Sequence, residues 1–208
     1  MSAVLEKNQS LVLPNISWKS YQQIADAVQN DTPAHFTYDR GKLEIMVLSL
    51  HHENLKKIVA RLFEKLCEEL DIDITPAGST TFQREDLERG FEPDECYYIE
   101  NAEFMRGKTS VNLDFDPPPD LTIEIDIKHS SLNRMSIFAA IGVPEVWRYD
   151  GENLTIHLLK NGKYEVSEIS LIIPKATSQK LSELVEAGKF LTWKDFLKKI
   201  KQYAQELA

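Results

Sequence analysis

Residues 120–128 read DLTIEIDIK and alternate strictly between aliphatic and polar side chains. This period of two is typical of a β-strand, because successive side chains point to opposite faces. One face then carries four aliphatic side chains, and the other carries polar ones: Thr122, Glu124, Asp126 and Lys128. The aliphatic face predicts a central strand, and the pair of acids on the polar face is the first candidate for a functional surface.

The elements around this strand indicate an α/β (or α+β) fold, with helices packed against a central sheet. The clearest helix is expected at residues 51–70, where apolar side chains recur at spacings of three and four. Other helices are expected at 18–29, 131–141, 178–187 and 193–206. Strands are expected in a hairpin over 35–48, at 72–76, 79–83 and 92–99, and in PEVWRYD, NLTIHLLK and KYEVSEI, with polar loops at 84–90 and 100–119. We expect a flexible arm over 1–16, a main domain over 17–175, and carboxy-terminal helices over 176–208 packed on the same domain.

Composition limits the partners. The chain has 208 residues, with 33 acidic against 24 basic side chains and a formal net charge of -9. This balance argues against a protein that coats nucleic acid by bulk charge, since such binding depends on Lys and Arg. No apolar run approaches the roughly 20 residues that span a bilayer, and no signal-peptide pattern opens the chain. Cys67 and Cys96 form neither a CxxC motif nor a disulfide framework. We therefore expect a cytoplasmic protein without a membrane partner.

The common short motifs are missing. The sequence contains neither GxGxxG nor GxxxxGK[ST], so a dinucleotide fold and a P-loop are not supported. His52 and Glu53 begin like a zincin helix, but Lys56 stands where the second histidine is needed. His51 and His52 are interpreted as solvated residues at a helix start, with a place at the mouth of a site as the alternative. His35, His129 and His157 show no ligand spacing.

The remaining candidate site consists of carboxylates. Glu124 and Asp126 share a strand face, so their Cβ atoms should lie about 6.5–7 Å apart. Two neighbouring acids need a cation, such as a divalent metal or Lys128, unless the face is half exposed and the charges point to water. Asp94 lies 30 residues before Glu124, at the start of the preceding expected strand. Carboxylates on two successive strands with a nearby lysine suit Mg²⁺-assisted cleavage of a phosphodiester.

Several stretches of the sequence, including the acidic strand, resemble a known family. Pro93-Asp94 followed by Asp126-Ile127-Lys128 spells a PD-(D/E)xK string. The stretches YDRGKLEIM, HHENLKKIVARL, GFEPDECYYI, PPPDLTIEIDIKHSSLNR and AAIGVPEVWRYDGENLTIHLL resemble the Uma-type family of restriction-endonuclease-like proteins, over about residues 17–160. The resemblance implies a nuclease core with a mixed sheet flanked by helices. It also implies metal ligation by Asp94 and Glu124, completed by Glu44, with Arg134 where many members carry a lysine.

One departure from the family pattern leaves alternatives open. Asp126, not a lysine, stands two residues after Glu124. The motif acid could therefore be Asp126 with Lys128 as its cation, or Arg134 could supply the cation from the following helix. Arg134 would stay protonated, so it could hold a phosphate but would be a poor base.

The expected function is a Mg²⁺- or Mn²⁺-dependent endonuclease that binds DNA weakly or locally, and a homodimer would suit the cleavage of both strands. The alternatives are an inactive binding or regulatory module on the same fold and a hydrolase of small phosphorylated substrates.

Overall fold

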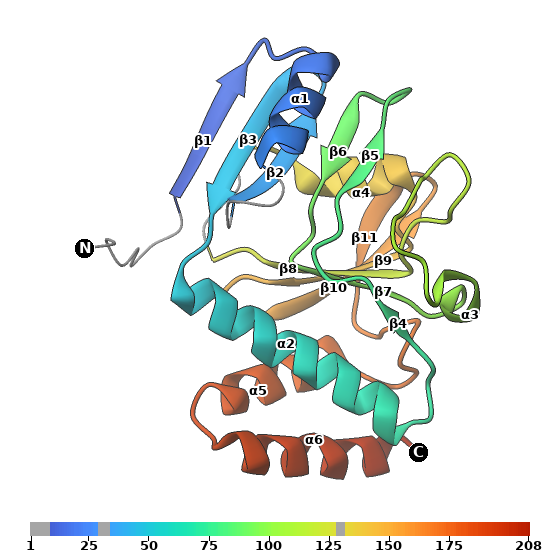
Figure 1. Cartoon of the computed structure of the whole chain (residues 1–208). Coiled ribbons are helices and arrows are strands. Elements are labelled where there is room, and N and C mark those ends of the chain that lie inside the picture. Colours follow the sequence, from blue (N-terminus) through green and yellow to red (C-terminus); the bar gives the residue numbers. More distant parts are fainter. Residues whose placement is uncertain (1–8, 29–33, 128–131) are drawn as a thin grey trace.

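The computed structural model describes residues 9–28, 34–127 and 132–208, whose strands form two sheets (Figure 1). The central sheet is mixed: β8 and β9 pair in parallel, and its other neighbouring strands pair antiparallel. In spatial order its strands are β11 (Lys163–Ser167), β10 (Leu154–Lys160), β9 (Glu145–Tyr149), β8 (Leu121–Ile125), β7 (Glu95–Tyr98) and β4 (Thr75–Pro76). The mixed central sheet expected from the sequence is confirmed.

Strand β8 lies inside this sheet, as its alternation predicts. All five of its residues are buried. Leu121, Ile123 and Ile125 belong to the largest apolar core, whereas Thr122 and Glu124 face the opposite side. The strand ends at Ile125, earlier than expected, and Lys128 lies outside the described residues. The polar face of this strand is therefore not the half-exposed surface that was the alternative reading of Glu124.

Helices flank both faces of the central sheet. One layer contains α2 (Leu50–Glu69), α5 (Ser178–Gly188) and α6 (Trp193–Leu207), which share the largest core with β8 (Figure 1). Side chains of Ser49, Thr177 and Thr192 cap their amino ends. On the other face, α4 (Arg134–Ile141) packs Ile137 and Phe138 into a second core, to which Met105 of the short α3 (Ala102–Met105) also belongs. The carboxy-terminal helices therefore contribute to the same core as the central strand.

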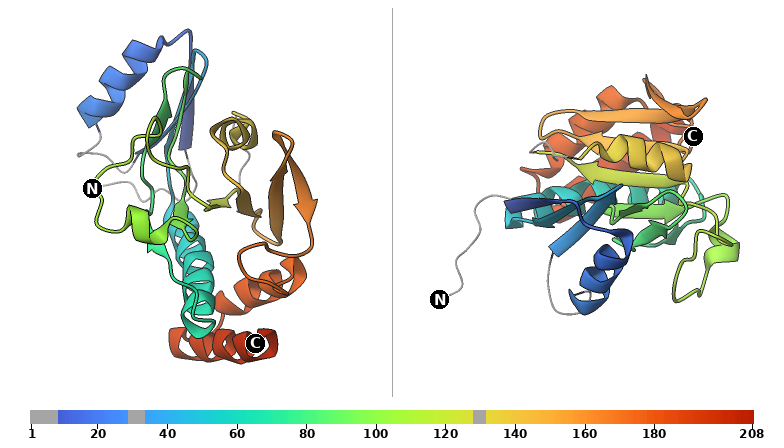
Figure 2. Two further views of the ribbon diagram at one scale, coloured as in Figure 1. Left: turned by 90° about the vertical axis from the view of Figure 1, so that its right-hand side faces the viewer. Right: turned by 90° about the horizontal axis from the view of Figure 1, so that it is seen from above.

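A second, antiparallel sheet stands beside the first (Figure 2). In spatial order it contains β1 (Gln9–Pro14), β3 (Lys42–Val47), β2 (Ala34–Asp39), β6 (Arg89–Phe91) and β5 (Phe82–Arg84). Helix α1 (Trp18–Val28) covers one face, where Trp18 and Tyr21 pack on Tyr38. The β2–β3 hairpin turns at Arg40 and Gly41, both with positive φ, as a two-residue turn of type I′ requires.

Two parts of this second sheet differ from the sequence-based expectation. The arm expected over 1–16 contains β1, which pairs along its length with β3. The polar loop expected at 84–90 is the turn of a short hairpin between β5 and β6. Strands β1 and β6 are held by pairing with neighbouring strands rather than by an apolar pattern of their own.

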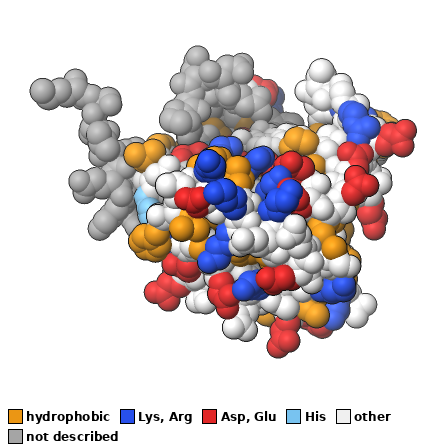
Figure 3. Space-filling model, turned by 90° about the horizontal axis from the view of Figure 1, so that it is seen from below, with side chains coloured by type: hydrophobic (Ala, Val, Ile, Leu, Met, Phe, Trp, Pro, Cys, Tyr) orange, Lys and Arg blue, Asp and Glu red, His pale blue; other side chains and the backbone are white. Residues whose placement is uncertain are grey.

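The outer surface of the helical layer carries charges of both signs. Viewed from below, Lys and Arg side chains lie among Asp and Glu side chains (Figure 3). Lys198 pairs with Asp195, and Lys201 of α6 pairs with Glu69 of α2. Among the described helices, none is both long enough and apolar enough to cross a bilayer.

Candidate active site

The central sheet brings two carboxylates together. Glu95 lies opposite Ile123 in the antiparallel register of β7 and β8, so Asp94, one residue before β7, reaches Glu124 on β8. Asp94 is 2 % exposed and Glu124 is 5 % exposed. The Oδ2 atom of Asp94 accepts a hydrogen bond of 2.7 Å from the backbone N–H of Ile125. The pair that the sequence points to is therefore placed at the interior of the fold.

The pKa values of the two carboxylates are shifted in opposite directions. Burial works to raise the pKa of Asp94, but the hydrogen bond and charge of His52 and the charge of Arg134 outweigh burial and lower it. Burial raises the pKa of Glu124 to about 7; Arg134 opposes this shift, and the nearby charge of Asp94 adds to it. A pair of acids whose pKa values are pushed apart is characteristic of functional sites.

Arg134 supplies a cation at this pair. It is the first residue of α4, and Asn133 caps that helix by accepting from the N–H of Ser136. The Arg134 guanidinium pairs with Oε2 of Glu124 and donates to the Thr37 hydroxyl at 3.1 Å. Burial works to lower the pKa of Arg134, but the charges of Glu124, Asp94 and Glu44 raise it. Arg134 is therefore a permanent cation in the site.

The β2–β3 hairpin closes one side of the site. Its residues on the face toward α1 are apolar, while Thr37 and Glu44 lie opposite each other on the other face. Glu44 is 1 % exposed, and its charge acts on Arg134. His35 shares this face, and burial lowers its pKa although the charge of Asp94 opposes the shift. Glu44 therefore lies close enough to Arg134 for its charge to act on the guanidinium.

The two other candidate residues, Asp126 and Lys128, are not part of the Glu124–Arg134 pair as the structure describes it. The Asp126 carboxylate follows the end of β8 and pairs with Arg148 of β9. The structure therefore gives Asp126 its own cation, separate from the Glu124–Arg134 pair. Lys128 lies outside the described residues. Among the described residues, Arg134 is a cation that the structure pairs with Glu124.

His52 is a member of the site that sequence reasoning placed at the surface. It is 1 % exposed, and its Nε2 lies 3.2 Å from Oδ2 of Asp94. Burial works to lower the pKa of His52, but the hydrogen bond and charge of Asp94 raise it. A sequence signal did exist: His52 precedes Leu55 by three positions and Val59 by seven, so it continues the buried stripe of α2. The interpretation of His52 as a solvated residue is therefore wrong, whereas the neighbouring His51 is exposed.

The donor set suits a hard divalent cation. The Oε1 atom of Glu124 is buried and has no hydrogen-bond partner among the described residues. An unpaired buried carboxylate oxygen is costly, and a cation would offset that cost. The described residues contain no group of three or more His, Cys, Asp and Glu placed to hold a metal. Two carboxylates still fit Mg²⁺, which keeps several of its waters and takes further ligands from substrate phosphate.

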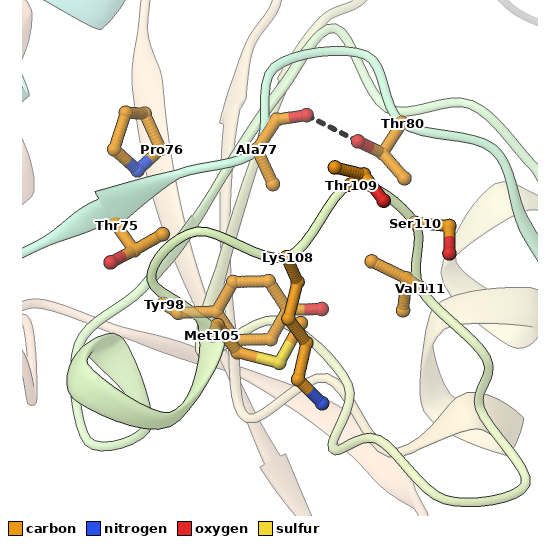
Figure 4. A pocket seen from close by; sticks show the side chains of 10 residues that line it. All are labelled: Thr75, Pro76, Ala77, Thr80, Tyr98, Met105, Lys108, Thr109, Ser110 and Val111. Atoms are coloured by element: carbon orange, nitrogen blue, oxygen red, sulfur yellow. Dashed lines mark hydrogen bonds between the residues drawn. The ribbon is translucent and has the colours of Figure 1, made fainter.

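A cavity of about 250 Å³ lies elsewhere, between α3 and the strand end at β4 (Figure 4). Thr75, Thr80, Tyr98 and Lys108 contribute to its wall. The Thr80 hydroxyl there donates to the Ala77 carbonyl, and Lys108 pairs with Asp116. None of the site carboxylates lines this cavity, so it is separate from the candidate active site.

A mixed sheet with helices on both faces and a buried acid pair beside a cation defines a nuclease-like α/β domain. The crystal structure of "a putative nuclease belonging to DUF820" from Anabaena variabilis ATCC 29413 has the same fold, with a TM-score of 0.53 and 16% identity. The match covers 89% of this chain and 99% of that chain. The chain belongs to the family described as "Uma2: Putative restriction endonuclease", whose model matches residues 18–188. This confirms the family and fold expected from the sequence. No curated protein matches the chain.

Proposed function

We propose that the protein is a metal-dependent endonuclease that hydrolyses phosphodiester bonds of DNA with Mg²⁺ or Mn²⁺. The observation that supports this most is the buried pair of Asp94 and Glu124, with the unpartnered Oε1 of Glu124. Family membership supports the reaction class. Asp94 and Glu124 would hold the ion, with Glu44 close enough to add its charge.

The residues of the proposed site have different roles. An ion held by Asp94 and Glu124 would act as a Lewis acid on the scissile phosphate. Arg134 binds a non-bridging phosphate oxygen and offsets the negative charge that develops during in-line attack. Because a guanidinium stays protonated, Arg134 does not take the proton of the attacking water. Two such sites would allow both strands to be cut in one complex, so the proposal includes a homodimer on DNA, which analytical ultracentrifugation can detect.

The test is a plasmid-nicking assay with Mg²⁺ and with Mn²⁺. We expect the wild-type protein to nick supercoiled DNA, and Asp94→Asn and Glu124→Gln to lose at least about two orders of magnitude in rate, as the loss of one charge-stabilising group typically does. Asp126→Asn is the matched comparison from the same strand end, and it should retain most of the activity because its partner is Arg148. Circular dichroism should show all three variants folded.

Two results would contradict the proposal. If the wild-type protein never nicks DNA with either ion, the proposed endonuclease activity is contradicted. Equal loss in Asp126→Asn and Glu124→Gln would mean that the two acids act in one site, against the pairing with Arg148.

A second function is favoured by one observation, the arginine at the cation position. A protein on this fold with an arginine in place of the motif lysine could bind DNA or another partner without cutting. Isothermal titration calorimetry separates the two cases. Binding of Mn²⁺ that depends on Asp94 and is accompanied by cleavage supports the enzyme, whereas Mn²⁺ binding without cleavage of DNA or of nucleotides supports the binding module.

A further inference from the structure

His52 and Ile125 hold one oxygen of Asp94 from two directions. The Nε2 atom of His52 lies 3.0 Å from the Ile125 carbonyl oxygen and 3.2 Å from Oδ2 of Asp94. A carbonyl only accepts hydrogen bonds, so Nε2 carries a proton and is the donor. The backbone N–H of Ile125 donates to the same Oδ2 at 2.7 Å. Both donors act on Oδ2, and together they fix the orientation of the carboxylate and of its other oxygen, Oδ1.

The histidine is itself held in place by α2. The Ser49 side chain caps the helix by accepting from the backbone N–H of His52 at 3.3 Å. Leu55 and Val59, on the same stripe, pack in the core against β8. His52 therefore joins the start of a long, well-packed helix to the end of the strand that carries Glu124. A side chain anchored at both ends in this way loses little entropy when it orients its neighbour.

We propose that His52 is a positioning residue that orients Asp94 for the divalent cation, by tethering Oδ2 and directing Oδ1 toward the ion. This inference rests on the proposed function, since it gives the orientation of Asp94 a purpose. His52 does not itself ligate the ion through Nε2, because that atom bears a proton and is already bonded to Ile125 and Asp94. Groups that orient a metal ligand in this way typically change metal affinity by about 10–100-fold when removed.

The experiment compares two amide substitutions of similar polarity. The side-chain nitrogen of His52→Gln can reach the position of Nε2, whereas the amide of His52→Asn is too short to reach Asp94. Calorimetry with Mn²⁺ on full-length protein should show about 10–100-fold weaker binding in His52→Asn and binding within a few-fold of wild type in His52→Gln. His51→Gln, at the exposed neighbouring position, is the control and should bind Mn²⁺ as wild type does.

A second readout needs no metal. In ¹⁵N-edited spectra of the metal-free protein, the Ile125 amide should shift in Asp94→Asn and in His52→Asn, and should return close to its wild-type position in His52→Gln. A merely structural histidine would not give this rescue by the longer amide. If His52→Asn fails to fold, His52→Leu takes its place in the comparison with His52→Gln. The proposal then predicts a shifted Ile125 amide and weaker Mn²⁺ binding in His52→Leu, and values close to wild type in His52→Gln.

The outcomes separate the two proposals. Wild-type protein that binds no Mn²⁺ would overturn the metal site, and with it the purpose assigned to His52. Wild-type binding that is unchanged in folded His52→Asn would overturn the positioning role alone. An Ile125 amide that is the same in wild type and His52→Asn would overturn the tether itself.

Discussion

Glu124 is held close to neutral pH by competing influences. Burial raises its pKa to about 7, the charge of Arg134 acts against this, and the charge of Asp94 acts with it. The folded protein therefore binds a proton on Glu124 more tightly than the unfolded chain does. For an acid of this kind, stability is highest below its ordinary pKa and falls as pH rises toward its folded-state pKa.

The contribution of Glu124 to the stability of the metal-free protein should therefore fall as pH rises from 4.5, its ordinary pKa, to about 7, and Glu124→Gln should remove that fall. We expect the stability difference between variant and wild type to grow in favour of the variant by about 1–3 kcal/mol across this range. Urea denaturation at several pH values in a chelating buffer measures it. His52, whose pKa is also raised, adds a fall of its own above pH 6.5, but it is present in both proteins, so the difference reports chiefly on Glu124. A difference that does not change with pH would contradict the raised pKa.

For individual residues, the sequence predicted which charged side chains belong to the site better than it predicted how they are arranged. Asp94, Glu124 and Arg134 were found because their residue types match a family pattern, and the structure brings them together. Asp126 was expected on the same strand face as Glu124, but β8 ends at Ile125 and Asp126 pairs with Arg148. The bond from His52 joins residues 73 positions apart in the chain, and no local pattern encodes such a contact.

Among the elements, the second sheet depends on close packing under α1. Gly90 lies in the three-residue strand β6, opposite Tyr38 of β2. A Cβ atom added at Gly90 would lie 2.4 Å from the Tyr21 hydroxyl oxygen and 2.9 Å from its ring. The glycine is therefore required by the approach of α1 rather than by backbone conformation.

Gly90→Ala should destabilise the protein by about 1–3 kcal/mol, since side chains cannot be overpacked without shifting their neighbours. The Tyr21→Phe background removes the nearest atom, so the cost of Gly90→Ala should be smaller there. Urea denaturation of the wild type, both single variants and the double variant measures this coupling. An equal cost in both backgrounds would mean that Tyr21 is not the obstacle.

The strands that sequence reasoning missed have a common explanation. β6 has only three residues, including a glycine, and β1 has an exposed outer edge, so neither shows the alternation that a half-buried strand usually does. Their places are set by pairing with β2 and β3. The long helices and the β2–β3 hairpin were predicted well because their signals, a 3/4 spacing and a turn at Arg40 and Gly41, are local.

For the whole molecule, the net charge of -9 remains a constraint on any binding to DNA. Basic side chains near the acid pair are already engaged: Lys56 pairs with Glu53, Lys57 with Glu95, and Arg134 with Glu124. On the helical layer, acidic side chains lie among the basic ones (Figure 3). Within the described part of the chain, these pairings leave the region around the site with little excess positive charge. A divalent cation in the site would change that balance locally.

Binding to a fluorescently labelled DNA duplex should therefore be weak in a chelating buffer and should tighten when Mn²⁺ is added. With about three basic side chains near the site among the residues that the structure describes, the slope of log affinity against log salt concentration should be no steeper than about -3, because each neutralised phosphate contributes about -0.9. Fluorescence anisotropy at low temperature and short times measures this, with gels to show that the duplex is still intact. Asp94→Asn should keep the weak binding but lose the response to Mn²⁺, since the substitution removes a ligand and leaves the basic side chains in place. A steep salt dependence in the chelating buffer, or an equal response to Mn²⁺ in Asp94→Asn, would place the DNA contacts on a surface other than the acid pair.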